Sequence, residues 1–268
     1  MLTERTFDPG EVTINYAEGP EAGPPLILLH GSTLRWQNLD PLIPPLSQSW
    51  HVYACDLRGH GKSGRATSGY RIIDYLSDTT AFVQQHIGKP TILLGHSMGA
   101  MVALGVASRV PKLVRAIILL DPPLLFRHSS IKAIHLYDWF TGLDAILKSA
   151  QSIEEVMPKF IPDIDEAGLQ IMSEMINSLD PEIIAVHLND QLFDGLDLEQ
   201  LSQQVVCPTL FLYGNRDLGG IVSQDDADFF KANVPQSIVI QIKDAGHMLH
   251  LDQADQVLEN ISLFANTL

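Results

Sequence analysis

The chain has 268 residues, of which 46% are hydrophobic, and its formal net charge at pH 7 is -15. This length and composition fit one large α/β domain with a sizeable core, or one domain that carries an insertion. The acidity and the lack of a run of Lys and Arg argue against a nucleic-acid-binding surface, because phosphates require clustered cations. The negative charge is instead expected to keep the protein soluble.

The first twelve residues, MLTERTFDPGEV, contain no apolar signal core, and no apolar run reaches the length that spans a bilayer. We therefore expect a cytoplasmic protein that does not bind membranes. Cys55 and Cys207 lie beside apolar runs, so they are expected to fill the core rather than to form a disulfide. A homodimer is compatible with the sequence.

Short apolar runs that end in turn residues predict strands, and helix-spaced apolar residues between them predict helices. The predicted strands are residues 12–16, 26–29, 52–54, 91–94, 116–120, 209–213 and 237–242. The predicted helices between and after them are residues 72–87, 98–109, 224–233 and 251–266. This alternation predicts an α/β fold with a mostly parallel, doubly wound central sheet.

The alternation stops after Asp121. The segments SIKAIHLYDWF, IEEVMPKF and AGLQIMSEMI carry helix-spaced apolar residues, and prolines separate them. Residues 122–202 are therefore predicted to form a helical insertion between two strands. Residues 1–121 and 203–268 would then make up the α/β core.

A serine stands where a predicted strand turns into a predicted helix. Gly95-His96-Ser97-Met98-Gly99 matches the pattern Gly-x-Ser-x-Gly. In so sharp a turn, the glycines remove side chains that would collide, and the serine hydroxyl stands exposed at the carboxyl edge of the sheet. Ser97 is therefore a candidate nucleophile. The alternative is a tight turn with an N-capping serine.

A serine nucleophile needs a histidine base and a carboxylate that orients the histidine. His247 follows a predicted strand and is the candidate base, whereas His250 is expected to pack against or cap the last helix. Asp217, in the loop after a buried strand, is the candidate acid. Asp121 also follows a strand and is the alternative acid, or else a turn former next to proline.

When the serine attacks a carbonyl group of the substrate, the carbonyl oxygen becomes negatively charged. Two N–H donors, the oxyanion hole, stabilise that oxygen. Met98 follows the nucleophile and is one candidate; Ser32, in the loop after a predicted strand, is the other. Aromatic and apolar residues could line a substrate pocket, although residues at helical spacing also build a core. The candidates for the pocket are Trp36, Trp139, Phe140 and Leu143.

Five segments together resemble the α/β-hydrolase superfamily, namely the Ser97 turn and LLHGSTLRWQNL, DLRGHGKSG, CPTLFLYGNRD and AGHMLHLD. The resemblance covers nearly the whole chain. It implies that residues 122–202 form a helical cap over an active site, and it is closest to small, cofactor-independent esterases, lactonases and perhydrolases. The chain departs from many relatives at Ala100, where another glycine is common, and at Ala254, where a proline often begins the last helix.

The expected function is hydrolysis of a small-molecule ester or lactone through an acyl-enzyme on Ser97. One alternative is hydrolysis of a carbon–carbon bond in a vinylogous diketone by the same triad, with Arg127 and Lys132 as candidates for binding a carboxylate. The other is a ligand receptor that retains the triad. No cofactor or metal is expected, because the sequence has no dinucleotide fingerprint, complete P-loop or metal-ligand cluster.

Overall fold

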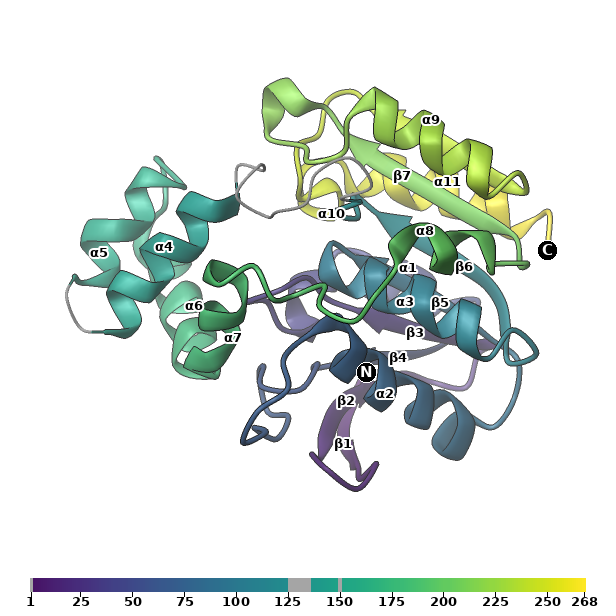
Figure 1. Ribbon diagram of the computed structural model, residues 1–268, viewed down its shortest axis with the longest axis horizontal. Helices are drawn as coiled ribbons and strands as arrows, with labels where there is room; N and C mark the ends of the chain where they lie inside the picture. The colour runs from purple at the N-terminus through teal and green to yellow at the C-terminus, as the bar shows by residue number, and fades with distance from the viewer. Residues whose placement is uncertain (1, 125–135, 149–150) are drawn as a thin grey trace.

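The computed structural model describes residues 2–124, 136–148 and 151–268 (Figure 1). Arg127 and Lys132 lie outside the described residues. One sheet has the strand order β1-β2-β4-β3-β5-β6-β7-β8. β1 pairs with β2 and β2 with β4 in antiparallel fashion, and the other pairings are parallel. The predicted α/β fold with a mostly parallel sheet is confirmed.

The strands are β1 (Thr3–Phe7), β2 (Ile14–Glu18), β3 (Pro25–Leu29), β4 (His51–Cys55), β5 (Thr91–His96), β6 (Val114–Leu120), β7 (Thr209–Gly214) and β8 (Ser237–Ile242). The α-helices are α1 (Ile43–Leu46), α2 (Ile72–Ala81), α3 (Met98–Arg109), α4 (Leu136–Leu147), α5 (Ile153–Val156), α6 (Glu166–Asn177), α7 (Pro181–Leu188), α8 (Leu198–Gln203), α9 (Gln224–Asn233), α10 (Leu249–Asp252) and α11 (Ala254–Ala265). A π-helical segment, Phe82–Ile87, continues α2.

Helices cover both faces of the sheet, because alternate residues of the central strands point to opposite sides. Ile27 and Leu93 belong to the hydrophobic cluster that contains buried residues of α2, α3 and α9. Leu28 and Leu94 belong to a second cluster, which contains buried residues of α1, α10 and α11. The sheet is thus the middle layer of three, and the carboxyl ends of its parallel strands share one edge.

The chain between β6 and β7 supplies helices α4 to α8. Helices α4, α5, α6 and α7 form a group to one side of the sheet in Figure 1, and we call these four helices the cap. Helix α8 begins within the predicted insertion but packs against α3 and α9 of the core. The cap helices therefore end earlier than residue 202.

Cys55 and Cys207 are buried free thiols, as expected from the sequence. No helix in the part of the chain that the structure describes has both the length and the apolarity needed to cross a bilayer.

A buried ion pair fixes the loop that follows β4. The guanidinium of Arg58, which is 2% exposed, donates to both carboxylate oxygens of Asp78 in α2, at 2.6 and 2.7 Å. It also donates to Gly69 O and to Glu11 Oε2, both at 2.9 Å. These bonds tie residues 56–64 to the core, and that loop in turn supports the candidate site.

We predict that Asp78→Asn lowers the free energy of unfolding by about 3 kcal/mol, because it leaves the buried Arg58 guanidinium without its bidentate partner. Urea unfolding measures this change. The control is Asp144→Asn, which removes the partner of Lys148 in an exposed pair one helical turn apart. This control should cost no more than about 0.5 kcal/mol. Equal losses in the two variants would show that the Arg58–Asp78 pair is not a structural anchor.

Candidate active site

Ser97 lies in a strained turn between β5 and α3. Its backbone has φ 51° and ψ -119°, in a region that a non-glycine residue rarely adopts. The turn is held by the Ser97 N–H, which donates to Leu120 O at 2.9 Å. A Cβ built on Gly95 would lie 2.2 Å from Gly99 O, and one built on Gly99 would lie 2.3 Å from Leu29 O. Only glycine therefore fits on either side of the serine.

His247 is oriented by Asp121. The His247 Nδ1–H donates to Asp121 Oδ2 at 2.7 Å, and the Asp121 side chain is completely buried. The same carboxylate accepts from the backbone N–H of Gly214 and of Ile221, each at 3.0 Å. Three donors thus satisfy the buried carboxylate, and a proton on Nδ1 makes His247 Nε2 the accepting nitrogen of the ring.

The prediction that Asp217 orients His247 is wrong. Asp217 is exposed in a short 3₁₀-helix, Arg216–Leu218, and its N–H donates to Asn215 Oδ1 at 3.0 Å. The end of β7 and the loop after it supply the backbone N–H groups of Gly214 and Ile221 to Asp121, and Asp217 supplies no carboxylate to His247. The sequence does contain a signal for Asp121, because this residue directly follows β6. Strand β6 pairs with β5, and β5 leads into Ser97.

His96 links the serine turn to the histidine loop. Its Nε2–H donates to His247 O at 2.9 Å, and the two rings lie 4.7 Å apart. Burial, followed by the charges of His250 and His247, holds the pKa of His96 well below its ordinary value. His96 is therefore neutral. His250 is buried and packs on His96 at 4.6 Å, as expected for a packing residue.

The loop that contains Ser32 lies against the serine turn. A Cβ built on Gly31 would lie 3.2 Å from Ser97 Cβ and 2.8 Å from His96 Nδ1, so glycine permits this close approach. Within the described part of the chain, neither Ser32 N–H nor Met98 N–H donates a hydrogen bond to another residue. No described residue therefore occupies either backbone donor, and both are candidates for binding an oxygen.

Two buried histidines hold this loop in place. His60 Nδ1–H donates to Arg58 O at 2.8 Å, and His60 Nε2 accepts from the Thr33 N–H at 3.1 Å. His30 Nδ1–H donates to Gly31 O at 2.7 Å, and His30 Nε2 accepts from the Leu57 N–H at 2.9 Å. Burial lowers the pKa of His60 to about 3 and that of His30 to about 4, so both act as neutral donor–acceptor pairs.

The four pocket candidates have different surroundings. Phe140 and Leu143 are buried inside the cap, where Phe140 packs on His187 of α7 with ring centroids 4.0 Å apart. Trp36 donates its indole N–H to Glu4 Oε1 at 3.2 Å. Trp139 is half-buried, and its indole N–H donates to Thr33 Oγ1 at 3.2 Å. Of the four, Trp139 is the one that the structure bonds to the Ser32 loop.

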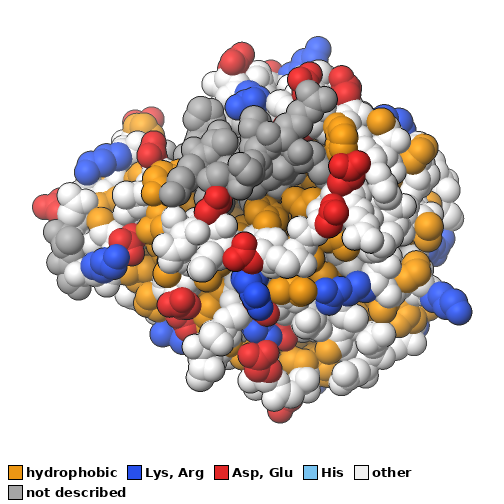
Figure 2. Space-filling view, in the orientation of Figure 1, with side chains coloured by type: hydrophobic (Ala, Val, Ile, Leu, Met, Phe, Trp, Pro, Cys, Tyr) orange, Lys and Arg blue, Asp and Glu red, His pale blue; other side chains and the backbone are white. Residues whose placement is uncertain are grey.

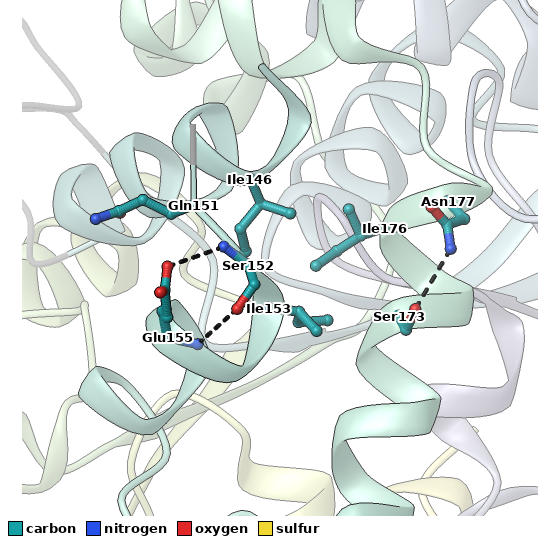
Figure 3. A pocket seen from close by; sticks show the side chains of 8 residues that line it. All are labelled: Ile146, Gln151, Ser152, Ile153, Glu155, Ser173, Ile176 and Asn177. Atoms are coloured by element: carbon teal, nitrogen blue, oxygen red, sulfur yellow. Dashed lines mark hydrogen bonds between the residues drawn. The ribbon is translucent and has the colours of Figure 1, made fainter. Parts of the chain in front are cut away.

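A separate hollow of about 510 Å³ lies within the cap (Figure 3). Its lining consists of Ile146, Gln151, Ser152, Ile153, Glu155, Ser173, Ile176 and Asn177. Hydrogen bonds between Ser152 and Glu155 and between Ser173 and Asn177 occupy polar groups at its edge. None of the candidate site residues lines this hollow.

These groups form a recognisable chemical arrangement. A hydroxyl on a strained turn, an imidazole with a free Nε2 and a buried carboxylate on Nδ1 are the parts of a serine nucleophile with its base. Backbone N–H groups next to the serine turn that donate to no other described residue can bind an oxyanion. No group of three or more His, Cys, Asp or Glu side chains among the described residues is placed to hold a metal ion.

Residues 26–260 match the sequence profile of the alpha/beta hydrolase family. The chain is 34% identical over 170 residues to 2-(acetamidomethylene)succinate hydrolase of Mesorhizobium japonicum, a match that covers 63% of this chain and 60% of that relative. It is 27% identical over 245 residues to pimeloyl-[acyl-carrier protein] methyl ester esterase of Proteus mirabilis, which covers 88% of this chain and 90% of the esterase.

The fold is also similar to the solved structure of N-formylmaleamic acid deformylase from Pseudomonas putida S16. The TM-score is 0.82 at 19% sequence identity, and the match covers 97% of this chain and 100% of that one. At this identity the likeness concerns the fold alone. The sequence match over most of the chain, together with the sheet and the serine turn, shows that this protein belongs to the alpha/beta hydrolase family of enzymes.

Proposed function

We propose that this protein is a serine hydrolase that cleaves small carboxylic esters or lactones through an acyl-enzyme on Ser97. His247 is the general base and Asp121 the acid that orients it. The observation that carries the proposal is the buried Asp121–His247 hydrogen bond of 2.7 Å, which His96 connects to the strained Ser97 turn. Hydrolase relatives, among them a methyl ester esterase, support the same chemistry.

In the first half of the reaction, Ser97 Oγ attacks the ester carbonyl and His247 Nε2 takes the hydroxyl proton. Asp121 stabilises the imidazolium that forms, since its carboxylate already accepts from Nδ1. The imidazolium then gives its proton to the leaving alcohol as the ester C–O bond breaks. The products of this half are the free alcohol and the acyl-enzyme.

In the second half, His247 Nε2 removes a proton from water, which attacks the acyl carbonyl. The carbonyl oxygen becomes negatively charged in both halves. The Ser32 and Met98 N–H groups are its proposed donors, because Met98 directly follows Ser97, the loop of Ser32 lies against the serine turn, and neither N–H donates to another described residue. Collapse of this intermediate returns the proton to Ser97 and releases the carboxylic acid.

The surface supports an uncharged or weakly charged substrate. Figure 2 shows hydrophobic side chains in the middle of one face of the molecule, with Asp and Glu side chains and some Lys and Arg side chains around them. The whole chain carries a net charge of -15, which would repel a highly anionic molecule. Hydrophobic side chains favour an apolar acyl chain. We therefore expect p-nitrophenyl esters of medium acyl length to be better substrates than short ones.

The same triad could instead break a carbon–carbon bond in a vinylogous diketone, or the protein could act as a receptor that retains the triad. A substrate panel separates these functions. Turnover of a diketone in preference to every ester would favour the first alternative. Stoichiometric ligand binding with no turnover of either class would favour the second.

We predict that Ser97→Ala lowers kcat for p-nitrophenyl ester hydrolysis by roughly 10⁴-fold or more, because the variant has no nucleophile to acylate. Release of p-nitrophenol measures the rate, and circular dichroism checks that the variant is folded. A folded Ser97→Ala variant within tenfold of the wild-type rate would contradict the proposal.

We further predict that Asp121→Asn lowers kcat by roughly 10³- to 10⁴-fold, because an amide cannot hold the same tautomer or stabilise the imidazolium. The matched control is Asp217→Asn, an exposed aspartate in the neighbouring loop, which should stay within twofold of wild type. The same ester assay compares both variants. A large loss in Asp217→Asn with little change in Asp121→Asn would reverse the assignment of the acid.

A further inference from the structure

Among the described residues, we compare hydrogen bonds that join the cap to the core at two separate places. At one, the chain around the start of α7 is bound through Asp180, which accepts from the Tyr70 hydroxyl at 2.8 Å and donates its N–H to Gly59 O at 2.8 Å. The other is the loop of residues 30–36, where Trp139 of α4 bonds to Thr33 at 3.2 Å. The first contact anchors the cap, whereas the second reaches the loop with the candidate oxyanion donor.

Thr33 is held in an unfavourable backbone conformation. Its φ is 65°, and a β-branched residue is strongly disfavoured there. The side chain is 2% exposed. Its backbone N–H donates to His60 Nε2, while its hydroxyl oxygen accepts from the Trp139 indole. The core therefore holds the backbone of Thr33, and the cap holds its side chain.

Trp139 is itself fixed within the cap. Its ring packs edge-to-face against Phe160, with centroids 5.4 Å apart and an interplanar angle of 85°. This contact sets the direction of the indole N–H. A salt bridge of 3.2 Å between Arg35 and Glu174 of α6 joins the same loop to the cap a second time. These two contacts couple the position of residues 33–35 to that of the cap.

We propose that Trp139 is a positioning residue for the oxyanion hole. By holding Thr33 Oγ1, it fixes the backbone of Thr33, which directly follows Ser32, and so restricts the backbone of Ser32, whose N–H is the proposed donor to the oxygen that becomes negative. This inference rests on the proposed serine hydrolase function. It makes the cap part of the catalytic geometry.

Two variants remove the hydrogen bond between Trp139 and Thr33, one by removing its donor and the other by removing its acceptor. Trp139→Phe keeps an aromatic ring against Phe160 but has no N–H, and Thr33→Val keeps the β-branch but has no hydroxyl. Each is expected to lower kcat by about three- to tenfold, the effect of one neutral hydrogen bond, with little change in KM. The double variant should be no slower than the slower single variant, because both remove the same interaction. Thr33→Ser keeps the hydroxyl that Thr33→Val lacks, so its kcat should be close to that of the wild type.

The controls are Thr141→Val, which removes an exposed hydroxyl bonded to Tyr137 O within α4, and Trp50→Phe in the core. Both should leave kcat unchanged. Urea unfolding of every variant separates loss of fold from loss of positioning. If Trp139→Phe fails to fold, the comparison of Thr33→Val with Thr33→Ser carries the test.

Three results would overturn the inference. The first is an unchanged kcat in Thr33→Val, and the second is additive losses in the double variant. The third is a Trp139→Phe effect confined to KM that varies with acyl length, which would make Trp139 a substrate contact instead. In all three, the wild type still turns over and Ser97→Ala does not, so the proposed function survives. Absence of wild-type turnover would overturn both proposals.

Discussion

The buried hydrogen bond between Asp121 and His247 is the interaction on which the site depends. A carboxylate with no exposed surface is costly unless donors surround it, and here the donors come from two other segments of the chain. His247 supplies one, and the backbone of Gly214 and Ile221 supplies two. The bond therefore joins the end of β6 to the loops that follow β7 and β8.

Neutral histidines extend this preorganisation across the site. Burial depresses the pKa of His30, His60 and His96, so each ring has one N–H to donate, and His30 and His60 each also accept a backbone N–H. His96 holds the His247 backbone, and His60 holds Thr33. Protonation would turn the accepting nitrogen of His60 into a donor and break its bond to Thr33. The geometry around Ser97 is thus built largely from uncharged imidazoles.

Patterns of neighbouring residues in the sequence predicted the elements whose formation depends on those residues alone. Buried strands read as apolar runs, and helix α3 has the predicted bounds. Strand β1 was missed because its residues are mostly exposed at a sheet edge, and α1 because its four residues include two prolines. The choice between Asp121 and Asp217 is not local. It depends on how the loop after β7 folds over β6, which no spacing in the sequence reveals.

The other assignments at the site rest on the proposal that Ser97 is the nucleophile. Intact mass after exposure to a fluorophosphonate probe, with peptide mapping of the product, tests this most directly. If Ser97 is the nucleophile, we expect one adduct per chain, located on Ser97, and loss of ester turnover in proportion to labelling. An adduct on another residue, or full turnover by protein completely labelled on Ser97, would contradict it.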